Sequence, residues 1–183
     1  VTVIKESRKG VGRARRTGTK KANGKYVLHL DADTRLPDIF LKKVVESFSN
    51  NSELACLGGQ FYFYDASWWL NLVRTPLFYF FLYFTQLVTS GKLGPMGNNM
   101  AFPRDVYNKT KGFCCELHFG EDANLCRQLS RFGKIQVDSN LHCTISARRF
   151  KIDKPLFKLG YNFLKLLLFD KVKNYKYPHS SEL

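Results

Sequence analysis

The stretch Lys25-Tyr-Val-Leu-His-Leu-Asp-Ala-Asp-Thr34 decides the fold class, because an apolar run rich in strand formers ends there in two carboxylates. Side chains on a strand alternate with a period of two, so Asp31 and Asp33 project to one side if the extended geometry persists to the strand end. Two hard oxygen donors on one side suit Mg²⁺ or Mn²⁺ and, through the metal, a diphosphate. The competing interpretation is a solvated turn, which the apolar strand leading straight into the acids disfavours.

The segments before and after this strand predict alternating strands and helices. Residues 1–4 and 54–63 are rich in strand formers, and residues 13–22 suit a short basic helix. Pro37 stands at a helix start, and the apolar residues that follow are expected on one buried helical face: Phe40, Leu41, Val44, Val45 and Phe48. This order of elements indicates an α/β layer architecture.

The second half of the chain continues the pattern. Residues 119–133 read as a helix with acids in its first turn, a stop at Gly133 and three buried positions, Leu125, Leu129 and Phe132. The other expected elements are a strand at 100–102, a short helix at 104–110 and two short strands at 135–137 and 141–145. A chain of 183 residues with 44% hydrophobic content can build one sizeable core.

Residues 67–88 are long and apolar enough to suggest a membrane span. Four residues interrupt the run: Asn71, Arg74, Pro76 and Gln86. We therefore expect a helix in or near the membrane interface, with Trp68 and Trp69 at the level of the headgroups. An ordinary core helix is the alternative.

The net charge of +14 lies at the two ends of the chain. Residues 1–25 hold nine Lys and Arg against one acid, residues 145–183 hold nine against three, and the residues between hold eleven of each. This distribution favours a phosphate-facing loop at one end and a membrane-facing tail at the other over a nucleic-acid-binding face. We expect a core over residues 1–150 and a basic, amphipathic, membrane-associating tail over residues 151–183.

The cysteine pattern bears on the cellular compartment. The five cysteines are odd in number and include no C-x-x-C, which is typical of reduced thiols in the cytosol. We expect a cytoplasmic protein at the cytosolic face of a membrane. The sequence begins with Val1 rather than Met, and we expect a fragment without its true N-terminus.

Four motifs follow one another at domain-scale spacing: Gly12-Arg-Ala-Arg-Arg-Thr-Gly18 with Ala22-Asn-Gly24, Val27-Leu-His-Leu-Asp-Ala-Asp33 with Pro37, Gly97-Asn-Asn-Met-Ala-Phe102, and Gly120-Glu-Asp122. In this order they resemble a family 2 glycosyltransferase of the GT-A fold. The resemblance implies a mixed sheet flanked by helices, here followed by a C-terminal amphipathic helix. It also implies that the first strand-helix unit is missing from this chain.

The resemblance assigns roles to the acids. Asp33 would bind a divalent metal, Mg²⁺ or Mn²⁺, that bridges the phosphates of a nucleotide-sugar, and Asp31 would contact the donor or assist the metal. Asp122 would be the general base toward the acceptor, supported by Glu121. Without the resemblance, plain helix capping would be the favoured interpretation of Glu121 and Asp122.

The resemblance also assigns roles to other residues. Arg15 and Arg149, the latter beside Arg148, would approach the donor nucleotide or its diphosphate. A generic basic segment leading into the tail would explain Arg148 and Arg149 equally well. His142 would complete the metal shell, although a structural histidine would explain its position too. The remaining implied positions form the acceptor loop: Gly97, Asn98 and Asn99. Arg16 departs from the family pattern, which commonly has Asn there.

The sequence therefore predicts a metal-dependent, inverting glycosyltransferase with a nucleotide-sugar donor. Its acceptor would be a hydroxyl group or a lipid phosphate, on a lipid or a glycan, and we expect contact with a membrane surface and none with nucleic acid. Two alternatives remain open. A metal-dependent nucleotidyltransferase would also use paired aspartates, and a non-enzymatic basic peripheral membrane module would need no site at all.

Overall fold

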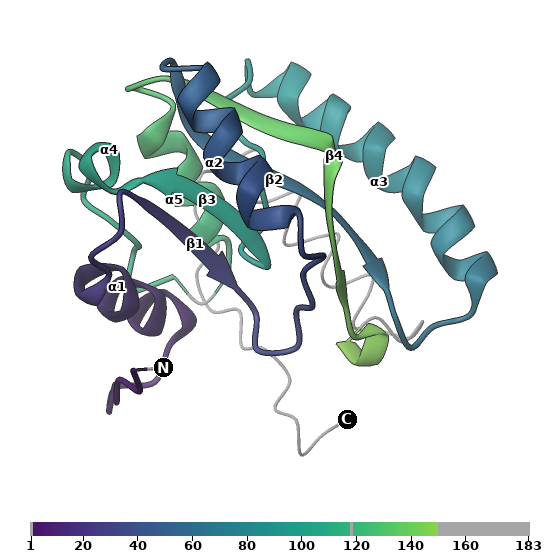
Figure 1. Cartoon of the computed structure of the whole chain (residues 1–183), viewed down its shortest axis with the longest axis horizontal. Coiled ribbons are helices and arrows are strands. Elements are labelled where there is room, and N and C mark those ends of the chain that lie inside the picture. The colour runs from purple at the N-terminus through teal and green to yellow at the C-terminus, as the bar shows by residue number, and fades with distance from the viewer. Residues whose placement is uncertain (1, 118, 150–183) are drawn as a thin grey trace.

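A computed structural model of the chain describes residues 2–117 and 119–149 and shows a four-stranded sheet (Figure 1). The strands are β1 (Tyr26–Leu30), β2 (Leu54–Phe63), β3 (Asn99–Pro103) and β4 (Lys134–Ile145). Their spatial order is β1-β3-β2-β4. Strand β3 runs antiparallel to both of its neighbours, whereas β2 and β4 are parallel, so the sheet is mixed.

Helices cover both faces of this sheet (Figure 1). They are α1 (Val11–Lys21), α2 (Phe40–Asn50), α3 (Trp68–Val88), α4 (Arg104–Asn108) and α5 (Glu121–Leu129), followed by the short 3-10 helix η1 (Ala147–Arg149). One core cluster places Phe40 and Val44 of α2 against Leu57 of β2. A second places Leu125 of α5 against Phe102 of β3. The predicted α/β architecture, with a mixed sheet between helices, is confirmed.

Most of the predicted elements have nearly the expected bounds, but three expectations about strand formation and burial are wrong. Residues 2–4 form no strand, and Val3 is 91% exposed. On α2, Leu41 and Val45 are 58% and 49% exposed, because only positions four apart face the sheet. Phe132 is 46% exposed because α5 ends at Leu129, one turn earlier than predicted.

The two short strands predicted at 135–137 and 141–145 are one strand, β4, with an irregularity. Asp138 pairs with Gly59 and His142 pairs with the next residue of β2, Gln60, so the residues between them bulge out of the ladder. A side chain at Gly59 would overlap the carbonyl oxygen of Leu141. The backbones of β2 and β4 therefore approach each other closely at Gly59, and this is where β4 bends.

Helix α3 is 21 residues long, yet no helix among the described residues is apolar and long enough to cross a membrane. Interior Pro76 interrupts its backbone hydrogen bonding. All five cysteines lie in the described part of the chain, and none of them forms a disulfide bond there. The predicted tail over residues 151–183, with its amphipathic helix, lies outside the described residues.

Candidate active site

The site is assembled around Arg15, which the first turns of α1 carry toward the sheet. A side chain at Gly12 would overlap the carbonyl oxygen of Cys114, and its Cβ would lie 3.6 Å from Glu121 Cβ. Only glycine therefore allows α1 to approach so closely the segment that leads into α5. Arg15 lies three residues further on, on the same face of the helix, and its side chain is only 12% exposed.

Arg15 joins two of the predicted acidic motifs. Its Nη2 donates to Asp31 Oδ1 at 3.1 Å, and its Nη1 lies 3.1 Å from Glu121 Oε1. The Nη1 contact is an ion pair without hydrogen-bond alignment. Gly97 packs directly on the guanidinium, since a side chain there would overlap Nη1, Cζ and Nη2. Four segments far apart in the sequence thus meet at one cation.

Glu121 is 4% exposed and has an unusual acidity. Burial, which disfavours the charged carboxylate, and the neighbouring charge of Asp122 raise its pKa from 4.5 to about 7, although the positive charge of Arg15 opposes the shift. The Glu121 carboxyl group therefore gains or loses its proton near neutral pH.

Asp122 is half-buried, and both of its carboxylate oxygens accept backbone hydrogen bonds. Oδ2 accepts from the Gly97 N–H at 2.9 Å and Oδ1 accepts from the Ala123 N–H at 2.8 Å. Gly120, with φ of 77° in the left-handed region that favours glycine, is the N-cap residue of α5, so both acids lie in the first turn of the helix.

Asp33 pairs with a second arginine. Arg148 Nη2 lies 3.0 Å from Asp33 Oδ2. Asp65 fixes the turn that carries this arginine, because its carboxylate accepts from the Ser146 hydroxyl at 2.5 Å and from the Ala147 N–H at 2.6 Å. These two hydrogen bonds lower the pKa of Asp65. Sequence reasoning did not identify Asp65, since nothing around a lone aspartate after β2 indicates its partners 81 and 82 residues away.

The paired asparagines have different surroundings. Asn99 is fully buried, accepts from the Gly59 N–H at 3.1 Å and donates to the carbonyl oxygens of Gly59 and Gln60. Its side chain therefore fastens β3 to β2. Asn98 is 7% exposed, and its Oδ1 accepts no hydrogen bond, while its backbone carbonyl accepts from Thr34 Oγ1 at 3.3 Å. Asn98 is thus held beside the Asp31-Ala-Asp33 turn with a free acceptor.

One of the predicted site residues is not brought into this cluster. His142 is exposed on β4, with its ring 5.9 Å from that of Tyr62. The side chain of Arg149 lies outside the described part of the chain. Among the described residues, no group of three or more His, Cys, Asp or Glu side chains could hold a metal ion. Asp31 and Asp33 remain as candidate metal ligands, with side chains 39% and 20% exposed.

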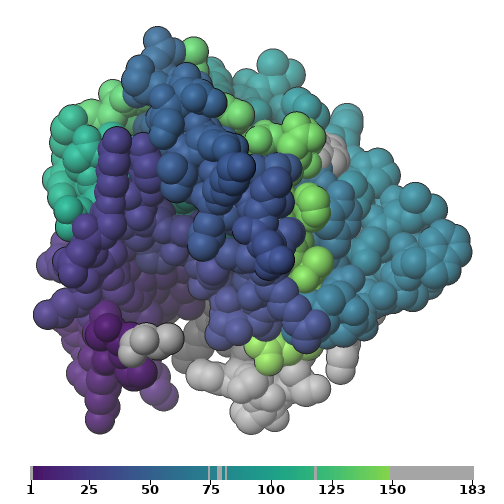
Figure 2. Space-filling model, viewed as in Figure 1, coloured from purple at the N-terminus to yellow at the C-terminus, as the bar shows by residue number. Residues whose placement is uncertain are grey.

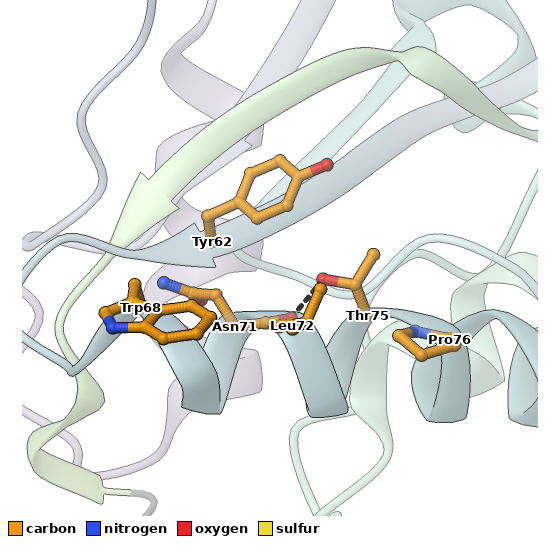
Figure 3. A pocket seen from close by; sticks show the side chains of 6 residues that line it. All are labelled: Tyr62, Trp68, Asn71, Leu72, Thr75 and Pro76. Atoms are coloured by element: carbon orange, nitrogen blue, oxygen red, sulfur yellow. Dashed lines mark hydrogen bonds between the residues drawn. The ribbon is translucent and has the colours of Figure 1, made fainter.

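A shallow groove of about 450 Å³ lies elsewhere, between β2 and α3 (Figure 3). Tyr62 contributes to it from β2, and the other lining residues come from α3: Trp68, Asn71, Leu72, Thr75 and Pro76. None of these residues carries a charge, so the groove holds no carboxylate for a metal ion and no cation for a phosphate.

Solved structures share this fold. A mannosyltransferase from Pyrobaculum calidifontis, in complex with GDP-Man and Mn²⁺, matches 91% of this chain and 43% of its own, with a TM-score of 0.58 and 17% identity. Glucosyl-3-phosphoglycerate synthase from Mycobacterium tuberculosis, in complex with Mn²⁺ and UDP-Glc, matches 96% of this chain and 57% of its own, with a TM-score of 0.57 and 16% identity. TarS from S. aureus matches 88% and 46%, with a TM-score of 0.52 and 14% identity.

The chain thus spans about half the length of these solved proteins, and the likeness establishes a common GT-A fold. No curated protein matches the sequence. The sequence profile described as "Glycosyl transferase family 2" matches residues 1–110, which include β1, β3, the Asp31-Ala-Asp33 turn and the Asn98-Asn99 pair. The chain therefore belongs to glycosyl transferase family 2.

Proposed function

We propose that this protein transfers a sugar from a nucleotide-sugar donor, with help from a divalent metal ion, to an acceptor that Asp122 activates. The observation that carries the proposal is the bridge made by Arg15, which links Asp31 after β1 to Glu121 at the start of α5. The bridge brings the acids expected to serve the donor and those expected to serve the acceptor within the reach of one side chain. Family membership independently supports glycosyl transfer.

The donor half of the proposed site is the Asp31-Ala-Asp33 turn. Both carboxylates are partly exposed hard oxygen donors, and two such ligands suit Mg²⁺ or Mn²⁺ when phosphate oxygens and water complete the shell. Solved proteins of the same fold bind Mn²⁺ with GDP-Man or UDP-Glc, which supports this assignment. When bound, the ion would neutralise the charge that develops on the departing nucleoside diphosphate.

The two arginines belong to the same half of the site. Each guanidinium now pairs with one of the carboxylates, Arg15 with Asp31 and Arg148 with Asp33. A guanidinium matches two phosphate oxygens as well as it matches a carboxylate. We propose that arrival of the diphosphate turns both arginines from the carboxylates toward phosphate oxygens, which leaves Asp31 and Asp33 available to the metal.

The acceptor half is Asp122. Its carboxylate would take the proton of an acceptor hydroxyl while that oxygen bonds to the anomeric carbon and the bond from that carbon to the diphosphate breaks, which inverts the anomeric configuration. The hydrogen bonds from Gly97 and Ala123 hold the carboxylate in one orientation for this task. The free Oδ1 of Asn98 would accept a hydroxyl hydrogen of the sugar or acceptor, because a buried acceptor without a partner is costly otherwise.

Two variants test the assignment of the two halves. Asp33→Asn is expected to abolish donor binding in the presence of Mn²⁺. Asp122→Asn is expected to keep donor binding and to lose at least about 100-fold of transfer to a hydroxyl acceptor, as the loss of a general base should. Asp38→Asn, an exposed acid further along the same loop, is the matched control and should change neither.

The same experiment distinguishes the acceptor classes. A lipid phosphate is already a nucleophile, so Asp122→Asn would keep full transfer to it while Asp33→Asn would lose transfer. Full transfer by both variants would overturn the proposed function.

A further inference from the structure

Helix α3 carries an apolar surface that the proposed chemistry does not use. All of its exposed side chains that the structure describes are apolar or aromatic: Trp68, Trp69, Leu72, Val73, Pro76, Leu77, Phe80, Tyr83, Phe84, Leu87 and Val88. Leu87, Trp68 and Phe80 are 80%, 77% and 72% exposed. Figure 2 shows α3 along one flank of the molecule, with its outer side uncovered in that view.

The side of α3 that faces the protein is, by contrast, partly polar. Asn71 donates to the Phe63 carbonyl at 3.0 Å and accepts from the Phe63 N–H at 2.9 Å, so it binds the end of β2 as a neighbouring strand would. Thr75 donates to the Asn71 carbonyl at 2.7 Å (Figure 3), and Thr85 is buried. A surface helix in water has the opposite arrangement, with its apolar face toward the core. The outer face of α3 is therefore built for a nonaqueous neighbour.

The charge of the chain indicates which neighbour this is. At a net charge of +14, two copies of the chain repel each other, whereas the negative surface of an anionic bilayer attracts it. The helix is about 30 Å long and does not qualify as a membrane span, so it would lie along the surface rather than cross it. Trp68 and Trp69, at its first two positions, are the residues that membrane interfaces favour most.

We propose that the outer face of α3 inserts into the interface of an anionic lipid bilayer and holds the protein at the membrane surface. Leu77, Phe80 and Phe84 would contact acyl chains at the middle of the helix. This inference does not depend on the proposed function, because it uses no residue of the candidate active site.

The two tryptophans provide a direct reporter, since Trp68 and Trp69 are the only tryptophans in the sequence and both are exposed. The experiment mixes the full chain with vesicles of phosphatidylcholine, with and without one third phosphatidylglycerol, and records Trp emission, quenching by brominated lipid and co-sedimentation. We expect a blue shift, quenching and sedimentation with the anionic vesicles, and at least tenfold weaker partition into pure phosphatidylcholine.

A pair of double variants tests whether partition depends on the outer face of α3 or on exposed apolar residues in general. Leu77→Glu with Phe80→Glu should weaken partition at least tenfold. Leu41→Glu with Val45→Glu, at the exposed apolar positions of α2, should leave partition unchanged. Circular dichroism melting confirms that both variants fold. Equal behaviour of the two double variants, or no blue shift with anionic vesicles, would contradict the proposal.

Trp emission recorded without vesicles tests whether something other than lipid covers the outer face of α3. An emission already blue-shifted in buffer would show that the face is covered without lipid. Light scattering would then assign the cover to a second copy if the particle is a dimer, or to the rest of the same chain if it is a monomer. Either result overturns the proposal, which requires solvent-exposed tryptophans in a monomer until anionic lipid is added.

Discussion

Gly97 shows how a single missing side chain supports the site. The Arg15 guanidinium occupies the space that a Cβ at this position would need, so Gly97→Ala should push Arg15 away from Asp31 and Glu121. We expect kcat/KM for sugar transfer to fall at least tenfold, which is about 1.4 kcal/mol of transition-state stabilisation. Steady-state kinetics with the donor that binds best provide the measurement.

The matched control for this variant is Gly18→Ala. A Cβ at Gly18 meets no atom within 4 Å, and the residue lies within α1. The substitution should leave kcat/KM unchanged and stabilise the protein by about 0.5–1 kcal/mol, because alanine is the better helix former. If Gly97→Ala were as active as Gly18→Ala, the contact with Arg15 would have no role in the reaction.

Glu121 predicts a pH dependence of stability. Its pKa of about 7 in the folded protein lies above its ordinary 4.5, so between these values the folded state keeps a proton that the unfolded state has released. The free energy of unfolding therefore falls as pH rises from about 4.5 to 7, by up to about 1.4 kcal/mol per pH unit from this group. Urea denaturation of wild type and Glu121→Gln across this range measures the difference, since glutamine does not titrate.

The expected result is a difference between wild type and Glu121→Gln that changes with pH inside this window and is constant below it. Glu46→Gln, at an exposed position where the carboxylate pairs with Lys42 on the surface, should run parallel to wild type throughout. Parallel curves for Glu121→Gln as well would show that Glu121 has an ordinary pKa.

Among the elements, β3 begins at Asn99 directly after Asn98, and the two neighbouring asparagines have opposite expected phenotypes. Asn99→Ala would leave the buried Gly59 N–H without an acceptor and should cost about 2 kcal/mol or more in stability. Asn98→Ala removes an oxygen that has no partner, so its stability should change by less than about 1 kcal/mol while transfer falls about tenfold. Urea denaturation and transfer kinetics on both variants check this, and equal destabilisation of the two would contradict it.

The local sequence pattern was sufficient to predict most helices and strands. It was insufficient where pairing between distant strands determines whether a segment forms a strand and how long the strand is. Strand β1 and helix α3 have their predicted bounds because apolar runs and turn residues delimit them in the sequence. Residues 2–4 have the composition of a strand but no neighbouring strand to bond. The length of β4 was not predictable either, because its continuity through the bulge depends on pairing with β2, 80 residues earlier in the chain.

At the scale of the whole molecule, the motifs identified the candidate acids but not their partners. Asp31, Asp33, Glu121 and Asp122 could be identified from sequence, since each follows a strand or opens a helix. That Arg15 bridges two of them depends on how closely α1 packs at Gly12, which is a long-range contact. The Arg148–Asp33 ion pair, and the hydrogen bond from Ala147 to Asp65 that holds the turn carrying Arg148, could not be predicted for the same reason.

The central claim is that Asp31 and Asp33 serve a nucleotide-sugar through a divalent metal. Titration calorimetry of the full chain with UDP-, GDP- and CDP-sugars, with and without Mn²⁺, tests it most directly. We predict that at least one donor binds tenfold or more tightly with Mn²⁺, and that Asp33→Asn loses this gain while Asp38→Asn keeps it. Binding of no nucleotide-sugar that depends on Mn²⁺, or a full Mn²⁺ effect in Asp33→Asn, would contradict the claim.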